Sequence, residues 1–229
     1  MNKEKVLGVL GGMGPYATLY FLQKIYDCTP TEKEWEHIRI ITDFNVKIPS
    51  RTRAILHNET SPVNYMIDSI NQLNKIGADL VAIPCNSAHY FYESVSDKIN
   101  IPWINMVKIV AEKIVFDGHK KVLILGGYVT NNKNLYSKYL KESVYLTTKE
   151  NKIILEIIEF IKIHAFIDEN RITKLKKLLQ NTRNKYDSII LACTELSIIY
   201  NTILEIINVP VFDSTIEYAE NIVSLIKEK

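Results

Sequence analysis

Two cysteines, Cys85 and Cys193, stand at the same point of two closely similar stretches of the chain. Residues 79–86 read DLVAIPCN and residues 187–194 read DSIILACT, and the sequences INIP and INVP follow them at the same distance. The acid, the thiol and the proline all differ in position by 108 (187 − 79, 193 − 85 and 210 − 102). This constant offset indicates a duplicated unit, and its two thiols suggest two equivalent acid/base groups in one active site.

Each of these cysteines ends a short apolar run and precedes a stretch with helical periodicity. Ligands of open parallel sheets bind beyond the carboxyl ends of the strands. Both thiols are therefore expected at such a crevice, where a helix N-terminus lowers the pKa of a thiol. A single cysteine after a buried strand is as often a small core residue, but the matched pair favours function. Cys28 has no counterpart and is expected to be structural.

Other kinds of site find little support. Neither Cys85 nor Cys193 has a second Cys or His at zinc-ligand spacing, His89 stands alone, and no CxxC motif occurs. A Ser-His-Asp triad stays open on composition, although the chain has no G-x-S-x-G elbow. Residues 11–15 (GGMGP) resemble a phosphate loop only superficially, because Pro15 lacks an N–H and no nucleotide motif is complete. We expect neither a metal nor a cofactor.

The elements that must position the thiols alternate along the chain. Short Val- and Ile-rich runs predict strands at residues 6–10, 38–42, 80–83, 122–125 and 188–191. Amphipathic stretches predict helices at residues 17–26, 63–76, 106–115, 135–140, 153–161 and 172–179. Ser61-Pro62 fits a helix start, and Gly77 and Gly118 fit helix ends. The alternation predicts an α/β fold of two pseudo-symmetric lobes, each a mostly parallel, flavodoxin-like sheet flanked by helices, with the site between them.

The boundaries of the lobes follow from the repeat. The runs KVLGVLGG and KVLILGG begin at Lys5 and Lys121, and their last glycines are 115 residues apart (127 − 12), so the halves differ by a small insertion or deletion. We expect an N-terminal lobe at residues 1–115 and a C-terminal lobe at residues 116–208. The strand-like piece and helix within residues 209–229 either end the second repeat or cross back to complete the first lobe.

Composition is that of an ordinary globular protein. The 229 residues are 47% hydrophobic and 24% charged. A net charge of +2, from 28 basic and 26 acidic residues, gives no case for nucleic-acid binding. Three cysteines argue against a disulfide framework, and neither a leader segment nor an apolar run of membrane-spanning length is visible. We expect a soluble cytoplasmic protein.

Several motifs together closely resemble the aspartate/glutamate racemase family, on its aspartate racemase side. They are GGMGPYAT at residues 11–18, CNSAH at residues 85–89 and ACTEL at residues 192–196. Weaker matches extend the resemblance over nearly the whole chain, at residues 48–52, Thr130, residues 158–162 and residues 213–215. The glutamate racemases of cell-wall synthesis look different, because they open with Asp-Ser-Gly and end in Cys-Thr-His.

The resemblance implies cofactor-independent racemisation by Cys85 and Cys193. One thiolate takes the α-proton from one face of the substrate, and the opposite thiol returns a proton to the other face. The resemblance also implies substrate-binding residues, which are Met13, Tyr16, Arg51, Asn86, Ser87, Thr130, Lys162 and Thr194. Among them Arg51 would grip a side-chain carboxylate and Lys162 would add a second positive charge, while backbone N–H groups at helix starts would hold the α-carboxylate. For Arg51 and Lys162 the alternative is an ordinary solvated side chain.

Some positions depart from the family pattern. Gly127 replaces the usual Thr, Glu217 a His, Ile163 a Gly, and Ser87 the commoner Thr. These changes bear on substrate choice and rate more than on mechanism, because the cysteine pair is intact.

The sequence therefore predicts a homodimeric aspartate racemase acting on a small amino acid with an acidic side chain, without nucleic-acid or membrane partners. Three alternatives remain. The chain could be a glutamate or broader amino-acid racemase. It could be a related Cys-dependent enzyme that isomerises or decarboxylates a small dicarboxylate, such as a maleate isomerase. It could also be a non-catalytic module that binds acidic amino acids, although binding alone needs neither cysteine.

Overall fold

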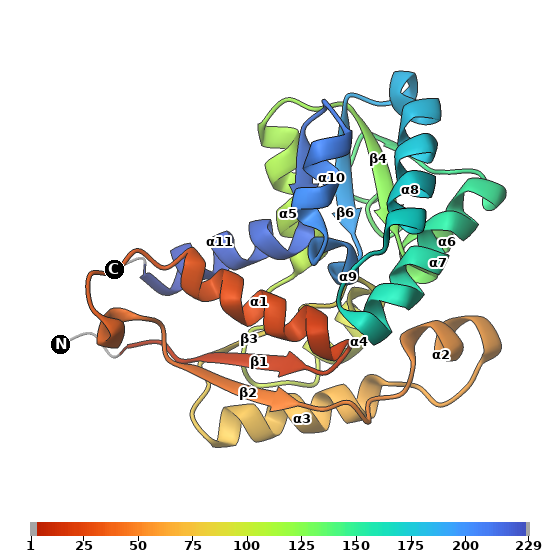
Figure 1. Cartoon of the computed structure of the whole chain (residues 1–229). Coiled ribbons are helices and arrows are strands. Elements are labelled where there is room, and N and C mark those ends of the chain that lie inside the picture. The colour runs from red at the N-terminus through yellow and green to blue at the C-terminus, as the bar shows by residue number, and fades with distance from the viewer. Residues whose placement is uncertain (1–3, 228–229) are drawn as a thin grey trace.

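Each half of the chain forms one parallel β-sheet in the computed structural model, which describes residues 4–227 (Figure 1). The first sheet has the order β2-β1-β3 and the second the order β5-β4-β6-β7, and every ladder is parallel. The strands are β1 (Leu7–Gly11), β2 (Ile40–Phe44), β3 (Leu80–Ala82), β4 (Lys121–Gly126), β5 (Glu142–Val144), β6 (Ser188–Ala192) and β7 (Val211–Asp213). The predicted fold of two parallel α/β lobes is confirmed.

Helices flank both sheets. In the first half they are α1 (Pro15–Asp27), α2 (Arg51–His57), α3 (Val63–Lys75), α4 (Tyr92–Ser96) and α5 (Met106–Phe116), with 3-10 helices η1 (Glu34–Glu36) and η2 (Asn86–Phe91). In the second half they are α6 (Tyr128–Asn132), α7 (Thr148–His164), α8 (Glu169–Thr182), α9 (Thr194–Ser197), α10 (Tyr200–Ile206) and α11 (Ser214–Lys227), with η3 (Arg183–Lys185). Within residues 4–227, no helix combines the length and the apolar character needed to cross a membrane.

The duplication is visible in the sheets. β3 gains a further parallel neighbour through an isolated bridge between Val81 and Trp103, and β6 gains β7, which begins at Val211. Trp103 and Val211 are again 108 residues apart (211 − 103), and so are the first residues of α5 and α11, Met106 and Ser214 (214 − 106). The offset seen in the sequence therefore holds from the cysteine motifs through the following strand to the next helix.

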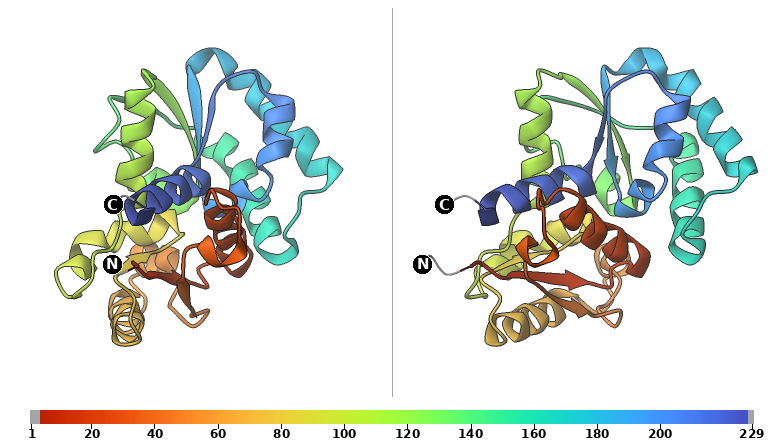
Figure 2. Two further views of the ribbon diagram at one scale, coloured as in Figure 1. Left: turned by 90° about the vertical axis from the view of Figure 1, so that its left-hand side faces the viewer. Right: turned by 60° about the vertical axis from the view of Figure 1, so that its left-hand side comes forward.

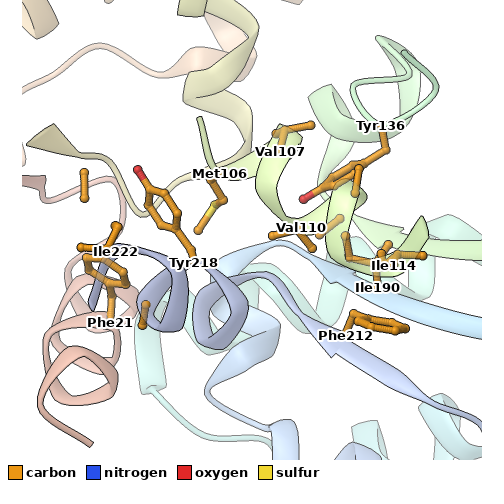
Figure 3. Packing of buried hydrophobic residues seen from close by; sticks show 14 of the residues in the cluster. Phe21, Met106, Val107, Val110, Ile114, Tyr136, Ile190, Phe212, Tyr218 and Ile222 are labelled. Carbon is orange, nitrogen blue, oxygen red and sulfur yellow. The ribbon is translucent and has the colours of Figure 1, made fainter. Parts of the chain in front are cut away.

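These two equivalent helices are exchanged between the lobes. α5 comes from the first half of the chain but stands beside β4 and β6, whereas α11 comes from the second half and lies along α1 above the first sheet (Figures 1 and 2). Figure 3 shows Ile114 of α5 beside Ile190 of β6, with Phe212 of β7 below them, all within one buried cluster. The main hydrophobic core is therefore shared by both lobes, which fixes one lobe against the other.

Tyr218 is one residue of α11 that contacts the first lobe. Its ring stacks on Phe21 of α1 at a centroid distance of 5.5 Å, and its hydroxyl donates to the carbonyl of Ile104 at 2.5 Å and accepts from the N–H of Ile83 at 3.3 Å. Of the C-terminal piece, residues 209–227 are described, and they are divided between the two sides, because β7 pairs within the second sheet while α11 covers the first. Apolar patterning identifies a buried helix face but not the lobe against which that face packs.

One predicted helix is wrong. Residues 135–139 form turns and Leu140 has no regular structure, because Asn134 adopts a left-handed conformation with φ of 49° and ends the helical path that α6 begins. The apolar spacing there reflects tertiary burial: Tyr136 is fully buried and its hydroxyl donates to Asn86 Oδ1 at 2.5 Å. No helix was predicted around Arg51, but Arg51 begins α2, where Ser50 Oγ accepts from the N–H of Arg53.

Candidate active site

A cavity of about 320 Å³ lies between the lobes, at the carboxyl ends of β1, β3, β4 and β6. It is lined by Met13, residues 50–53, residues 85–87, residues 127–130, Leu155, Ile158, Glu159, Lys162 and residues 192–195. The loops after the four strands supply most of this lining, and α2 and α7 supply the rest. Cys85 and Cys193 line the same cavity, which is the arrangement expected for two thiols at strand ends that share one crevice.

Most of the substrate-binding residues implied by the sequence come together here. Those that line the cavity with the cysteines are Met13, Arg51, Asn86, Ser87, Thr130, Lys162 and Thr194. Tyr16 is not among the lining residues and its side chain is 42% exposed in the first turn of α1. Cys28 lies at the far end of that helix, at its C-cap, away from the cavity.

The first glycine turn brings Met13 to the cavity. Gly12 has φ of +88°, and a Cβ there would lie 2.6 Å from the carbonyl carbon of Asn45, so only glycine fits. Its N–H donates to Thr18 Oγ1 at 3.0 Å, which ties the turn to α1. The GGMGP motif thus serves close packing and places a main-chain segment at the site.

Cys85 is the N-cap residue of η2 and is 5% exposed. Its Sγ lies 3.4 Å from Ser87 Oγ, and either atom can be the donor. A hydroxyl partner of this kind can donate to a thiolate or accept from a thiol. Cys85 therefore has a neutral hydrogen-bond partner in both of its protonation states.

Cys193 has a different partner. It is the N-cap residue of α9, and its thiol donates to Glu195 Oε2 at 2.9 Å. Burial raises the pKa of the Cys193 thiol well above its ordinary value, and the charge and hydrogen bond of Glu195 raise it further, against the opposing effect of Lys162. The expected lowering of the thiol pKa is therefore wrong for Cys193, because α9 spans only four residues and burial beside a carboxylate outweighs its N-terminus.

A buried polar network joins the two strand ends behind the cavity. Asn86 donates from Nδ2 to Ser214 Oγ at 3.0 Å and accepts at Oδ1 from Tyr136. Ser214 follows Asp213, whose Oδ1 accepts from Ser197 Oγ at 2.7 Å, and burial raises the pKa of Asp213 to about 6. This network links Asn86, the residue after Cys85, to α9, the helix after Cys193. The Asn86 amide therefore has a protein partner at both ends, and one N–H of its Nδ2 is left as a donor.

Arg51 holds two loops of the cavity wall together. Its Nη2 donates to the carbonyl of Met13 and its Nη1 to the carbonyl of Pro49, each at 3.2 Å, while its Nε is buried without a partner. The guanidinium therefore has donors left for an anion at the cavity. Arg53 also lines the cavity, but its side chain is turned to solvent and forms a paired contact with Glu59.

Lys162 reaches the cavity from α7. Its Nζ contacts Glu159 Oε1 at 2.5 Å, and 42% of its side chain is exposed. Burial alone would lower the pKa of Lys162, but the hydrogen bond that Lys162 donates to Glu159 and the charges of Glu195 and Cys193 raise it. Lys162 is thus a cavity cation that already has an acidic neighbour.

Sequence reasoning assigned no role to three groups of this site. Glu195 stood out only as part of the ACTEL motif, although its spacing of two from Cys193 was the available signal. Tyr136 carried no signal because it lies in a turn, and Glu159 is indistinguishable from an exposed helix residue until α7 is placed over the cavity.

Alanine is expected to affect the two adjacent glycines of the second turn very differently. A Cβ at Gly126 would lie 2.9 Å from Thr130 Cβ and from Asn131 Oδ1, so Gly126→Ala should destabilise the protein by about 1–3 kcal/mol. At Gly127 φ is −67°, and a Cβ would meet only Cys193 Sγ at 3.8 Å. Gly127→Ala should therefore be close to neutral, because a gain of about 0.4–1 kcal/mol through the unfolded chain is offset by the poorer N-cap residue that Ala makes at the start of α6. Urea unfolding of both variants checks this, and an equal loss of stability in the two variants would contradict the packing described.

Comparison with known proteins relates the whole chain to racemases. The family model for Asp/Glu/Hydantoin racemases matches residues 10–222. The broad specificity amino-acid racemase RacX of Bacillus subtilis (strain 168) is 28% identical over 229 residues, which cover 96% of this chain and 97% of that protein.

Solved structures agree with this relation. Aspartate racemase of Picrophilus torridus is 28% identical with a TM-score of 0.87, covering 98% of this chain and 95% of that one. The glutamate racemase isoform RacE1 of Bacillus anthracis is 20% identical with a TM-score of 0.70, covering 99% of this chain and 83% of that one, and so shares the fold.

Proposed function

Because the chain belongs to the Asp/Glu/hydantoin racemase family, we propose that it racemises aspartate with Cys85 and Cys193 as its two proton-transfer groups. The observation that carries this proposal is the placement of both thiols on one cavity, each at the carboxyl end of an equivalent strand in a different lobe. Racemisation is symmetric about the α-carbon, so it needs one proton-transfer group on each face. A duplicated site supplies such a pair.

The reaction proceeds by transfer of one proton on each side of the substrate. The thiolate of one cysteine takes the α-proton, and the electron pair of the broken C–H bond stays on the α-carbon. The thiol of the other cysteine then gives its proton to the opposite face, which inverts the configuration. The developing negative charge requires nearby donors, and the backbone N–H groups of Asn86, Ser87 and Thr194 at the starts of η2 and α9 are our candidates.

Arg51 and Lys162 support a preference for an acidic side chain. Both line the cavity, and Arg51 donates only one hydrogen bond from each of Nη1 and Nη2, which leaves a second N–H on each nitrogen. A guanidinium binds a carboxylate through two parallel hydrogen bonds, which gives direction as well as charge. We assign Arg51 to the side-chain carboxylate and Lys162 to the same end of the substrate. Met13 and Thr130 complete the wall, and Tyr16 is the member of the predicted set that the cavity leaves out.

A broader racemase is the second candidate, and the apolar part of the wall favours it. Val129, Leu155 and Ile158 line the same cavity as Arg51, so it also offers surface to an uncharged side chain. The relative RacX is named for broad specificity. Glutamate as substrate falls within this candidate. The homodimeric state and the cytoplasmic location stay predictions from the sequence.

Isotope exchange tests the proposal against its rivals. We expect the purified enzyme, with no cofactor added, to incorporate deuterium at the α-carbon of L- and D-aspartate in heavy water and to convert each into the other. NMR and chiral chromatography measure the two events. A dicarboxylate isomerase or decarboxylase would instead change a double bond or release carbon dioxide, and a binding module would show saturation without exchange. If several apolar amino acids are racemised fast and aspartate only slowly, the protein is a broader amino-acid racemase rather than an aspartate racemase.

A further inference from the structure

The two thiols of the site have chemically different partners. Cys193 donates to a carboxylate oxygen of Glu195 at 2.9 Å, whereas Cys85 contacts the hydroxyl of Ser87 at 3.4 Å. We propose that Glu195 keeps Cys193 protonated in the free enzyme, so that Cys193 enters the reaction as the acid. This inference rests on the proposed racemase function for its role in turnover, although the protonation itself is a property of the unliganded protein.

The fold holds the Glu195 carboxylate in place. Glu195 is 5% exposed in α9, and its Oε1 would lie 3.1 Å from a Cβ at Gly14. Gly14 belongs to the first glycine turn, so the opposite lobe leaves room for this carboxylate by carrying no side chain there. The carboxylate therefore lies between the Cys193 thiol of its own lobe and the Gly14 backbone of the other lobe.

The charged groups around Cys193 oppose one another. Lys162 reaches it from α7 and favours the thiolate, but Lys162 is itself paired with Glu159. Tyr136 lies on the 133–139 turn, where the charge of Cys193 contributes to the raised pKa of this tyrosine. Burial of Cys193 is the largest effect and, with Glu195, outweighs Lys162, so the pKa of the thiol is raised. Across the cavity, Cys85, Arg51 and Arg53 belong to the other lobe.

The proton balance follows from this arrangement. In one direction the Cys85 thiolate takes the α-proton and forms an S–H bond, while the Cys193 S–H bond breaks and its proton joins the α-carbon. The enzyme is left with a Cys85 thiol and a Cys193 thiolate beside the Glu195 carboxylate, two negative groups in contact. This pair regains a proton from water, and Cys85 must release one before the next turnover in the same direction.

This inequality has a defined kinetic signature. The two enantiomers have the same free energy in water, so kcat/KM must be equal in the two directions whatever the thiols do. A difference in resting protonation therefore appears in kcat and KM separately, with compensating changes. Replacing the carboxylate should make kcat for the L-enantiomer more similar to kcat for the D-enantiomer, and the two KM values should become more similar as well.

The direct test is the pH dependence of Cys193 alkylation by iodoacetamide, measured without substrate in the full chain with Cys28→Ser and Cys85→Ser. With Glu195 present, the midpoint should lie above the value of about 8.5 for an ordinary thiol. Glu195→Gln keeps the shape of the side chain and removes its charge, so the midpoint should fall by at least about one pH unit. The gain in alkylation rate near pH 7 is smaller than the gain in thiolate, since a less basic thiolate is a weaker nucleophile.

Glu159→Gln is the matched control, because it removes a carboxylate that lines the same cavity but contacts Lys162 rather than a thiol. Its midpoint should move far less than that of Glu195→Gln. A midpoint at or below the ordinary thiol value with Glu195 intact overturns the proposal, even if the Gln variant fails to fold. An unchanged midpoint in a folded Gln variant overturns it as well. Both results leave the racemase proposal standing, since no turnover is measured.

Discussion

Replacement of either Cys85 or Cys193 by serine is expected to lower racemisation of aspartate by about 10⁴-fold, the upper end of what one acid/base group contributes. Inversion needs a proton transfer on each face of the α-carbon. A serine hydroxyl is too weak an acid to donate that proton, and it is not ionised near neutral pH and so cannot act as the base. Steady-state conversion of L- to D-aspartate, followed by chiral chromatography, measures the loss. Addition or removal of pyridoxal phosphate should change nothing.

Cys28→Ser is the control for these variants. Cys28 lies at the C-cap of α1 outside the cavity, and burial raises the pKa of its thiol. Its replacement should leave kcat/KM unchanged. Full activity in Cys85→Ser or Cys193→Ser would show that the two-thiol mechanism is wrong for this protein.

Each single variant should also retain half of the chemistry. The surviving thiolate can still exchange the α-hydrogen on its own face, so in heavy water deuterium should enter only L-aspartate in one variant and only D-aspartate in the other. The configuration of each sample should not change. Exchange of the same enantiomer in both variants would mean that the cysteines act on one face. The result depends on which enantiomer each variant exchanges. Absence of exchange in one variant does not identify a face, because a thiol that is poorly ionised without its partner exchanges neither enantiomer.

The cysteine pair could be predicted from the sequence because duplication leaves a direct trace. A constant offset of 108 survives in the chain, and parallel sheets place equivalent strand ends at one edge, so Cys85 and Cys193 were expected at a shared crevice. The same offset recurs in the bridge at Trp103 and in β7. The local sequence pattern was sufficient to predict features that depend on one strand and on the residue at its carboxyl end.

The remaining features depend on partners that are distant in the sequence. An apolar helix face does not say which sheet it covers, so the exchange of α5 and α11 between the lobes was not predictable from periodicity. The spacing at residues 135–140 is produced by the burial of Tyr136 against Asn86, across 50 residues of chain. A helix N-terminus was expected to lower the pKa of Cys193, and it is outweighed by burial and by Glu195.

The position of Arg51 at the cavity does not by itself fix its function. The IPSRT match implied a carboxylate-binding arginine, and the structure places Arg51 at the cavity. Its guanidinium also donates to the backbone carbonyls of Met13 and Pro49. Arg51 therefore has two candidate functions, to bind the substrate side chain and to hold the loop that carries Met13. Only measurement on substrates with and without a side-chain carboxylate separates them.

Arg51→Ala is expected to cost about 2–4 kcal/mol of transition-state binding for aspartate, because a buried, charge-assisted contact is lost. This corresponds to a fall of about 30- to 1000-fold in kcat/KM. For alanine, which has no side-chain carboxylate, the loss should be much smaller and should reflect only the release of the Met13 loop. Arg51→Lys keeps the charge without the planar fork and should fall between wild type and Arg51→Ala.

Arg53→Ala is the matched control for Arg51→Ala. Arg53 is a second arginine of α2 that lines the same cavity, but its guanidinium is engaged in an exposed pair with Glu59, and such pairs contribute at most about 1 kcal/mol. Its replacement should change kcat/KM for aspartate by less than about fivefold, since 1.4 kcal/mol corresponds to a factor of ten. If Arg51→Ala instead reduces kcat/KM equally for aspartate and alanine, the selectivity assigned to Arg51 is wrong. Its backbone contacts to Met13 and Pro49 would then be its whole contribution, and the side-chain carboxylate would have to be bound by Lys162.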